Sequence, residues 1–487
     1  MKIALVGFGV SGAALLITLM NSGKLNADTQ IDIFDPNPEP GVGIAYGKDS
    51  DRLLLNAFPT AMSLNPDNKH EFSEWLESRY PEYDATEDLV PRTVFGEYAS
   101  ERLTPLLEHN NVTHHKKEIV DAVVLEASST PSYQLEDSEG EEYGAYDTLF
   151  FALGNPPYKD FYDLNGQKNY IHNPYPVDEK LKDIEEDTKV AIVGSNLTAF
   201  DLVNYLSHEK DLQHPIGVFT VVPHFNSLRV PPYQGPALHY SLDRKRIKEE
   251  AYQHKGNLPL NRLIEIIKQD LKANNIDLTS VRNHYDPGDL EQTHLAYFDQ
   301  EHPELSKLQG YIARLSGHLG DLYMALSKKD QVRYHLEYAP RFRHYQVRLA
   351  PDAVTTMYEL WNQDQLFVVH DLVDVAKSDT FVLKSKSGKI YKADIVINAS
   401  GFDFNTDTIG TVSPLLSNLL DKGFLLDKNK KGILVTWPEN QVMNQQYGKL
   451  DNCFFMGPWV SNTHHANNNV KVLVQKASEI VNHYMDS

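Results

Sequence analysis

The clearest pattern of apolar and polar positions is a short apolar run that leads through three spaced glycines into a second apolar run. Residues 3–6 are apolar, and Gly7, Gly9 and Gly12 follow in the spacing Gly-x-Gly-x-x-Gly. This order of residues predicts a buried strand, a tight turn and the first turn of a helix.

This arrangement is typical of a dinucleotide-binding βαβ unit. Gly7 allows the tight turn, Gly9 leaves room for a pyrophosphate against the backbone, and Gly12 lets the helix pack close to the strand. The helix N-terminus directs its free N–H groups at the phosphates. The segment Ile31-Asp-Ile-Phe-Asp35 predicts the second strand and ends in a carboxylate that can accept a hydrogen bond from a ribose hydroxyl.

The same order of residues recurs at positions 188–203, where an apolar run leads through Gly194 into an apolar helix pattern. Asn196 and Ala199 stand where the second and third glycines would be. Asn tolerates left-handed backbone conformations and Ala still permits close helix packing. The sequence therefore predicts a second Rossmann-like unit, which either binds a dinucleotide or has lost its ligand.

The next predicted strand of this second unit, residues 217–222, ends without an acidic residue and leads to Arg229. A missing acid with an arginine nearby suits the 2′-phosphate of NADP(H). Arg229 suits a solvated loop equally well, and both interpretations stay open.

Apolar runs at 146–154 and 393–401 each end in a glycine, and both predict strands that carry the chain from one nucleotide domain to the other. Between them, apolar residues at helical spacing predict helices at 261–272 and 311–326. The expected fold class is α/β, with two Rossmann-like dinucleotide-binding domains and a helical insertion over residues 234–364. That insertion is expected to form a cap over the substrate site or an oligomer interface.

Composition narrows the range of partners. The 487 residues include 46 Lys and Arg and 67 Asp and Glu, so the net charge is −21, which argues against nucleic acid and anionic membranes as partners. Cys453 is the only cysteine, so a disulfide framework and a Cys-x-x-Cys redox pair are excluded. We expect a cytoplasmic protein without a secretory signal. No metal motif is visible, and the sequence does not specify the oligomeric state.

Several further motifs carry a family resemblance. They are Pro40-Gly-Val-Gly-Ile-Ala-Tyr46, Leu53-Leu-Leu-Asn56, Val90-Pro-Arg-Thr-Val-Phe-Gly-Glu-Tyr98, Leu153-Gly-Asn155, Val193-Gly-Ser-Asn-Leu-Thr198 and Val396-Ile-Asn-Ala-Ser-Gly401. Together with the first glycine motif, their order and spacing resemble bacterial FAD/NAD(P)-binding proteins related to class B flavoprotein monooxygenases and N-hydroxylating amine monooxygenases. The resemblance covers nearly the whole chain.

The resemblance implies FAD in the first unit and NADPH or NADH in the second. It places FAD on residues 1–160 plus 390–487 and NAD(P) on 187–233 plus 365–389. The implied FAD-binding residues are Gly7, Gly9, Ser11, Gly12, Asp35, Gly43, Tyr46, Asn56, Arg92, Val120, Gly154 and Gly457. The implied NAD(P)-binding residues are Gly194, Asn196, Thr198 and Arg229.

Two departures from the family pattern matter. Pro458 stands where the family has an acid after Gly457, so the ribityl contact must come from backbone or from elsewhere. The monooxygenase fingerprint between the two units is poor, and His172 within it has the wrong spacing for a catalytic role. In the insertion, Arg341, Arg343 and Arg348 could meet an anionic group or pair with the surplus acids.

The resemblance therefore implies an FAD-dependent oxidoreductase that uses NAD(P)H, with a monooxygenase acting on a small molecule as the leading interpretation. Two alternatives remain open. One is an NAD(P)H-dependent flavin reductase or oxidase without oxygen insertion, and the other is a non-catalytic flavin-binding sensor or interaction protein. No catalytic side chain is assigned, because flavin carries the redox chemistry.

Overall fold

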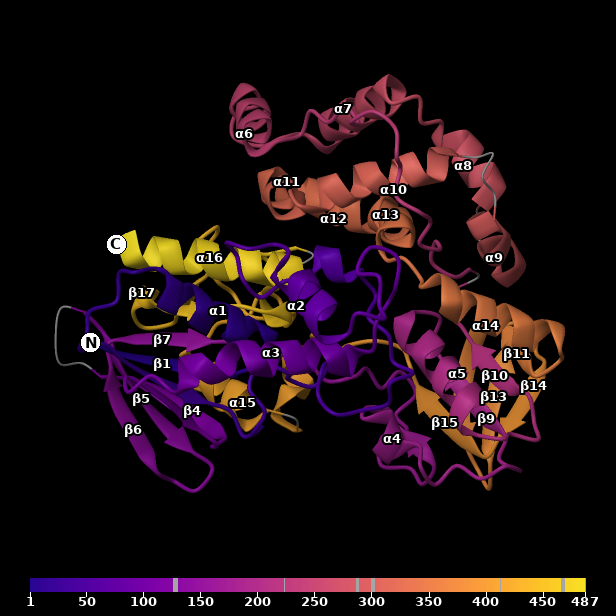
Figure 1. Ribbon diagram of the computed structural model, residues 1–487, viewed down its shortest axis with the longest axis horizontal. Coiled ribbons are helices and arrows are strands. Elements are labelled where there is room, and N and C mark those ends of the chain that lie inside the picture. Colours follow the sequence, from indigo (N-terminus) through magenta and orange to yellow (C-terminus); the bar gives the residue numbers. More distant parts are fainter. Residues whose placement is uncertain are drawn as a thin grey trace. The chain divides into compact units, whose positions relative to one another are not determined.

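The structure is a computed structural model that describes residues 1–125, 130–222, 224–285, 289–298, 303–411, 413–465 and 469–486. It divides into two compact units (Figure 1). Unit 1 comprises Met1–Pro157 and Phe402–Ser487, and unit 2 comprises Tyr158–Gly401.

The centre of unit 1 is a six-stranded sheet with the strand order β16-β17-β7-β1-β2-β3. All neighbours in this sheet are parallel except β16 and β17. The strands are β1 (Lys2–Val6), β2 (Gln30–Phe34), β3 (Val112–His115), β7 (Thr148–Phe151), β16 (Gln441–Asn444) and β17 (Gly448–Phe455). Because β1 and β7 are buried along nearly their whole length, on both faces, the sheet needs cover on both sides.

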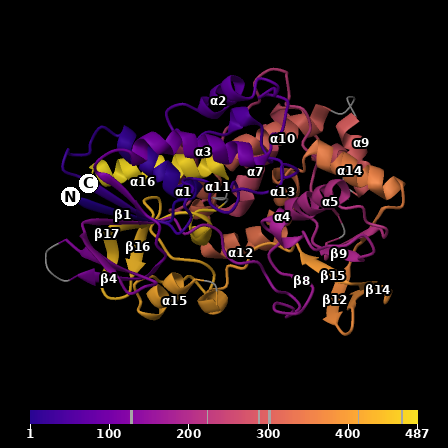
Figure 2. The same ribbon diagram turned by 60° about the horizontal axis from the view of Figure 1, so that its bottom comes forward.

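One face of this sheet is covered by helices α1 (Val10–Asn21), α3 (Arg92–Leu107) and α16 (Val470–Asp486), with α2 (Glu71–Arg79) packed on α3. The other face is covered by the antiparallel strands β4 (Ile119–Leu125), β5 (Ser132–Asp137) and β6 (Glu142–Tyr146) and by α15 (Pro414–Asp421). Figure 2 shows these two covers on opposite sides of the sheet. The short helices of unit 1 are η1 (Pro59–Ala61), η2 (Thr406–Thr411) and η3 (Pro458–Val460).

Unit 2 contains a five-stranded parallel sheet with the order β11-β10-β9-β15-β8 and an antiparallel sheet β12-β13-β14. The strands are β8 (Tyr170–Ile171), β9 (Val190–Val193), β10 (Ile216–Phe219), β11 (Leu366–Val369), β12 (Leu372–Lys377), β13 (Phe381–Ser385), β14 (Ile390–Ala393) and β15 (Ile395–Asn398). Helix α4 (Val177–Lys180) is short, and α5 (Leu197–Glu209) and α14 (Pro351–Asn362) pack together, with α14 against β11.

The predicted insertion is helical, and its helices gather into one region of unit 2 in Figure 1. They are α6 (Arg244–Gln253), α7 (Leu260–Ala273), α8 (Leu278–Tyr285), α9 (Leu290–Phe298), α10 (Pro303–Ser316), α11 (Leu319–Ala325), α12 (Lys328–Glu337) and α13 (Ala339–Gln346). These helices enclose a hydrophobic core of their own. The helix predicted at 311–326 is divided into two helices, α10 and α11. The break lies at Gly317, whose N–H donates to the Arg314 carbonyl in a turn that ends α10.

Two segments lie elsewhere than the sequence pattern placed them. Residues 390–401, expected with the flavin-binding domain, lie in unit 2, because β15 pairs with β9 along its whole length. Helix α14, expected in the insertion, packs on α5 and β11 of the nucleotide-binding sheet as well as on α9. Both differences come from long-range pairing, which local periodicity does not encode.

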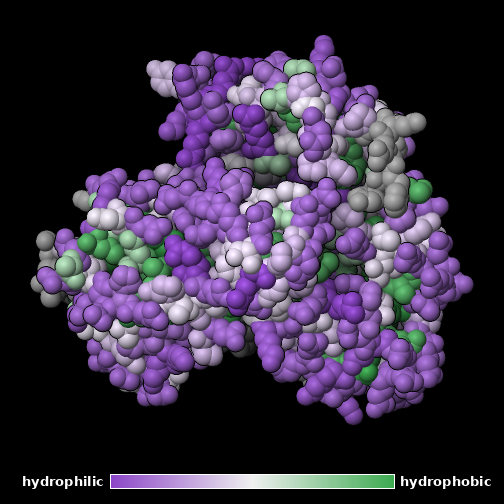
Figure 3. Space-filling view, in the orientation of Figure 1, coloured by the Kyte–Doolittle hydropathy of each residue, from purple (hydrophilic) through white to green (hydrophobic). Residues whose placement is uncertain are grey.

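The surface agrees with the acidic composition. On the face shown in Figure 3, hydrophilic residues cover most of each unit and hydrophobic residues form only small patches. Within the part of the chain that the structure describes, no helix is long and apolar enough to cross a membrane.

Candidate dinucleotide-binding sites

The turn between β1 and α1 needs its glycines. Gly7 has a φ of +96°, and a Cβ there would lie 2.3 Å from the carbonyl oxygen of Ala152 in the neighbouring strand. A Cβ at Gly12 would lie 2.1 Å from the carbonyl oxygen of Gly7. These contacts fix the close approach of helix to strand that the spacing predicted.

Gly9 differs from the other two glycines. It caps α1 with a φ of −77°, which any residue adopts. A Cβ there would meet Gly43 at 3.4 Å from its Cα, which is a tight but tolerable contact. The absence of a side chain at Gly9 is therefore needed less for the fold than for what occupies the space beside it.

That space is a cavity of about 470 Å³ within unit 1, the size range of ligand sites. It is open to solvent along one side and runs past the β1–α1 turn. The predicted residues that line it are Gly7, Gly9, Ser11, Asp35, Gly43, Tyr46 and Gly154. The structure thus brings together residues from four separate segments of the sequence.

Asp35 is held rigidly at the end of β2. One carboxylate oxygen accepts the N–H of Phe8 at 2.6 Å, and the other accepts the N–H of Asn37 at 2.8 Å. Each carboxylate oxygen retains a second lone pair. Asp35 therefore can still accept a hydrogen bond from a hydroxyl in the cavity while its orientation is fixed by the backbone.

Tyr46 and Arg92 lie where the loop after β2 meets α3. Burial raises the pKa of the Tyr46 hydroxyl, and the Arg92 guanidinium opposes this. The Tyr46 ring packs on Phe95 with 4.7 Å between centroids. A Cβ at Gly96 would lie 2.0 Å from the Tyr46 carbonyl oxygen, so α3 touches this loop directly. Arg92 Nε donates to the carbonyl of Leu54 at 3.1 Å.

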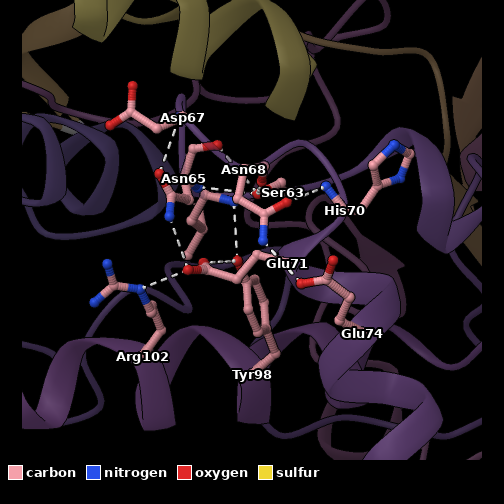
Figure 4. Close-up of polar contacts among 10 residues, drawn as sticks. Ser63, Asn65, Asp67, Asn68, His70, Glu71, Glu74, Tyr98 and Arg102 are labelled. Carbon is pink, nitrogen blue, oxygen red and sulfur yellow. Dashed lines mark hydrogen bonds and ion pairs between the residues drawn. The ribbon is translucent and has the colours of Figure 1, made fainter.

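Asn56 is exposed and begins the loop that leads to α2. A polar network pins the rest of this loop to α2 and α3 (Figure 4). At its centre the Glu71 carboxylate accepts from Asn65 Nδ2, Tyr98 hydroxyl and Arg102 Nε at 2.9, 2.7 and 3.1 Å. The Tyr98 hydroxyl in turn accepts the N–H of Leu64 at 3.1 Å. This network stabilises one wall of unit 1, and neither Asn56 nor Arg92 lines the cavity itself.

The remaining predicted residues of unit 1 lie beside the cavity. The Val120 carbonyl accepts from Asn418 Nδ2 at 2.9 Å, so this carbonyl is used within the fold. Gly457 has a φ of +106°, and a Cβ there would lie 3.8 Å from Ser11 Oγ. The next residue, Pro458, lines the cavity, so this position offers backbone atoms and no side-chain carboxylate to a ligand.

Several residues of the cavity wall were missed by the sequence reasoning. Lys117 and Glu118 enter from the start of β4, and Val470 and Leu473 enter from the first turn of α16. Lys117 forms an ion pair with buried Asp137 at 3.3 Å. Glu118 lies two residues before Val120, which the resemblance did name, but the other three carry no recognisable motif.

Unit 2 repeats the geometry of the first turn. The Gly7 N–H donates to the Phe34 carbonyl at the end of β2, at 2.8 Å. The Gly194 N–H donates in the same way to the Phe219 carbonyl at the end of β10, at 2.9 Å. A Cβ at Gly194, whose φ is +152°, would lie 2.2 Å from the carbonyl oxygen of Ala399. Ala399 therefore plays the part in unit 2 that Ala152 plays in unit 1.

Asn196 caps α5 in place of the second glycine. Its side-chain oxygen accepts the N–H of Leu197 and also accepts from Asn226 Nδ2, both at 3.0 Å. Thr198 lies in the first turn of α5 and is half-buried. Asn226 thus ties this turn to the segment that carries Arg229.

Arg229 is half-buried rather than fully exposed. Its backbone N–H donates to the Leu349 carbonyl at 2.9 Å. Burial and, to a lesser extent, the charge of the nearby Arg348 guanidinium lower the pKa of Arg229 to about 10. At pH 7 the side chain remains a cation.

Other chemistry has little support. Among the residues that the structure describes, no group of three or more His, Cys, Asp or Glu side chains could hold a metal ion. Cys453 is fully buried, and burial raises the pKa of its thiol well above the usual value. The site chemistry is therefore that of two glycine turns, each beside polar groups suited to nucleotides.

Comparisons with known proteins agree with this geometry. Residues 4–156 match a family model described as FAD-NAD(P)-binding. No curated protein matches the sequence. Among solved structures, L-lysine 6-monooxygenase from Pseudomonas syringae has a TM-score of 0.63 at 11% identity, covering 99% of this chain and 98% of that chain.

Two further structures are similar over their whole length. The FAD-bound cadaverine monooxygenase of desferrioxamine biosynthesis from Erwinia amylovora has a TM-score of 0.61 at 10% identity, covering 100% of this chain and 94% of that chain. Ornithine N-hydroxylase from Kutzneria, solved with reduced FAD, NADP⁺ and L-ornithine, has a TM-score of 0.58 at 13% identity, covering 99% and 98%. These likenesses confirm the predicted fold class and the family resemblance at the level of the fold.

Proposed function

We propose that this protein is an FAD-dependent monooxygenase that uses NADPH and acts on a small molecule. The observation that carries the proposal is the repeated turn: Gly7 and Gly194 make the same hydrogen bond and the same close approach, one in each unit. A monooxygenase that holds FAD and NADPH in separate domains of one chain needs two dinucleotide sites. The FAD-NAD(P)-binding match over 4–156 supports FAD in unit 1.

The residues of unit 1 fit FAD. The open space beside Gly9 and the N–H groups at the start of α1 suit a pyrophosphate, and fixed Asp35 suits a ribose hydroxyl. When bound, the flavin would supply the redox chemistry, after reduction by the nicotinamide. The chain's own residues would bind and orient it, and half-buried Tyr46 and the apolar wall from α16 would keep water from one side.

The substrate is expected to be a small amine. The similar structures are named for ornithine, lysine and cadaverine, each with a terminal primary amine.

We place the protein in the cytoplasm. A reducing compartment suits both the supply of NADPH and a buried free thiol at Cys453.

The first test is the colour of the protein. We expect it to purify with FAD rather than FMN and to bleach when NADPH is added without oxygen. Heat release and chromatography identify the flavin, and absorbance at the flavin band follows the bleaching. A colourless protein that cannot be reconstituted with FAD would contradict the proposal.

Turnover then separates the alternatives. We expect L-ornithine, L-lysine or cadaverine to increase NADPH consumption and to yield a hydroxylated amine in proportion to it. NADPH consumption that yields only hydrogen peroxide with every amine would indicate a reductase or oxidase. Flavin binding without NAD(P)H consumption would indicate a sensor.

Arg229→Ala tests the coenzyme preference. A guanidinium binds a phosphate in bidentate fashion, so we expect the NADPH concentration for half-maximal flavin reduction to rise about 10- to 100-fold. This corresponds to about 1.5–3 kcal/mol for a charged hydrogen bond. The requirement for NADH should hardly change. Equal weakening of both nucleotides would assign Arg229 to the fold or to a phosphate that they share.

A further inference from the structure

A series of aromatic rings runs through unit 1 from the cavity wall to helix α2. Tyr46 lines the cavity, and its ring centroid lies 4.7 Å from that of Phe95. Phe95 lies 5.5 Å from Tyr98, and Tyr98 lies 5.8 Å from Trp75. Trp75 lies 5.9 Å from Tyr80. All these separations fall in the range of roughly 4.5–7 Å that is usual for aromatic rings in contact. We call these five residues the aromatic path.

The aromatic path is buried in its middle and open at its two ends. Phe95 and Tyr98 are 0% and 1% exposed, so solvent does not reach them. Tyr46 is half-buried at the cavity, and Trp75 and Tyr80 are half-buried at the surface of α2. The path therefore joins the cavity to the surface through rings that are shielded from water.

Three rings of the aromatic path each donate a hydrogen bond to a carboxylate of their own, and Figure 4 shows the first of these pairs. The pairs are Tyr98 with Glu71 at 2.7 Å, Trp75 Nε1 with Glu101 at 2.8 Å and Tyr80 with Glu97 at 2.5 Å. A buried tyrosine needs such a partner in any case, whereas half-exposed Trp75 and Tyr80 can also donate to water. An aromatic ring that loses an electron becomes a much stronger acid, and a carboxylate at this distance can take its proton.

The hydroxyl protons of the aromatic path stay on their rings until an electron leaves. Burial and then the charge of Glu71 raise the pKa of Tyr98. The hydrogen bond to Glu97 is the main cause that raises the pKa of Tyr80 to about 12. Both phenols are therefore neutral at pH 7, so each proton moves only when its ring is oxidised.

We propose that the aromatic path carries single electrons from the surface of α2 to the flavin in the cavity when light excites the oxidised flavin. The inference goes beyond the proposed function but rests on it for the presence of FAD in unit 1. Flavin supports one-electron chemistry, and absorption of light makes its oxidised form a stronger oxidant. Phenol and indole rings are the groups of this wall that lose an electron most readily.

The first transfer uses the buried half of the aromatic path. The excited flavin gains one electron, which passes through the rings of Tyr46 and Phe95 and is lost by Tyr98. The hydroxyl proton of Tyr98 moves at the same time to Glu71. Charge therefore stays balanced inside the apolar wall, where an unpaired charge would be costly.

The following transfers bring the oxidised site to the surface. Tyr98 regains an electron from Trp75 and its proton from its own carboxylate, while the indole proton of Trp75 moves to Glu101. Tyr80 then restores Trp75 in the same way and passes its own proton to Glu97. A soluble thiol at the surface gives one electron to Tyr80, which takes its proton back from Glu97, and the thiol proton enters water. The thiyl radicals from two such events join as a disulfide.

The test uses the FAD-loaded full chain under blue light without oxygen, with β-mercaptoethanol as the thiol. Loss of the oxidised flavin band gives the rate of photoreduction, and electron paramagnetic resonance of samples frozen under light detects tryptophan and tyrosine radicals. We expect the wild-type protein to bleach and to show such radicals. Trp75→Phe keeps an aromatic ring but removes the indole, so it should slow photoreduction at least about tenfold and remove the tryptophan signal.

Two further variants make this result specific. Trp361→Phe is the matched control, because it makes the same exchange at an exposed tryptophan of α14 in unit 2, and it should behave as wild type. Glu101→Gln keeps an acceptor for the indole N–H but removes the base, so it should slow photoreduction about three- to tenfold. All three variants should keep the flavin content of the wild type and its bleaching by NADPH in the dark. A merely structural role of Trp75 would lower these two quantities together with photoreduction.

Direct attack of the thiol on the flavin through the open side of the cavity does not depend on Trp75. Equal photoreduction of the wild type and Trp75→Phe therefore overturns the inference, and so does equal slowing by Trp361→Phe or loss of flavin from Trp75→Phe. If amines are hydroxylated and Trp75→Phe bleaches as the wild type does, only the inference fails. If the light results hold but no amine is hydroxylated, the aromatic path stands and the proposed monooxygenase function fails. A protein that cannot bind FAD overturns both.

Discussion

Gly9→Val is expected to yield a folded protein that binds its flavin more weakly. Because Gly9 has an ordinary φ and its Cβ direction leads past Gly43, a valine can adopt the backbone of the turn. Its methyl groups would enter the cavity beside the start of α1. Overpacking costs roughly 1–3 kcal/mol, so we expect FAD binding to weaken about 5- to 150-fold. The flavin content of the purified protein and its titration with FAD measure this.

Two neighbouring variants make the result specific. Gly9→Ala adds only the atom that fits at 3.4 Å from Gly43, so it should keep most of the flavin. Gly12→Ala places a Cβ 2.1 Å from the Gly7 carbonyl oxygen, so it should lower the melting temperature of unit 1 as well. Full FAD occupancy in Gly9→Val would show that the pyrophosphate lies elsewhere.

The turns could be predicted from the sequence because their geometry is local. A strand that turns at a positive-φ glycine into a closely packed helix requires glycines at fixed spacing. This spacing can be recognised in the sequence without knowing which distant segments pack against the turn. Even the degenerate turn at Gly194 was found, since Asn196 and Ala199 preserve the physical requirements of the missing glycines. Asp35 was found for the same reason, because the second strand of such a unit ends beside the first turn.

The walls of the cavity could not be predicted in this way. Lys117 and Leu473 reach the cavity from segments that are more than 80 and 400 residues away from Asp35 along the chain. Nothing in their own neighbourhood marks them, because their place depends on how β4 and α16 pack on the sheet. The family resemblance reached Val120 and Gly457, which lie beside the cavity but not in its lining.

The boundary at 390–401 illustrates the same limit. The run 393–401 was recognised as a strand that ends in a glycine, but its sheet was not. Only the pairing of β15 with β9, and the contact of Ala399 with Gly194, assigns it to unit 2. The pairing of Leu228 with Leu349, which brings Arg348 near Arg229, is likewise invisible to periodicity because more than a hundred residues separate them.

Gly194→Ala is expected to slow reduction of the flavin by NADPH strongly while FAD stays bound. The φ of +152° disfavours any L side chain, and the new Cβ would lie 2.2 Å from the Ala399 carbonyl oxygen and 2.6 Å from its carbon. Backbone atoms cannot rotate away, so the β9–α5 turn must shift, at a cost of roughly 1–3 kcal/mol. We expect at least about tenfold slower reduction at a fixed NADPH concentration.

Gly388→Ala is the matched control for Gly194→Ala. It lies in the turn between β13 and β14 of the same unit with a φ of +83°, and a Cβ there meets nothing within 4 Å. It carries backbone strain without the clash, so it should lose some stability and keep NADPH reduction. Dithionite should bleach the flavin equally in both variants, because the proposed FAD site lies in unit 1, away from both substitutions. If Gly194→Ala keeps wild-type reduction by NADPH, this turn does not hold the nucleotide. If it loses FAD as well, the two sites do not act separately and the assignment of one dinucleotide to each unit is wrong.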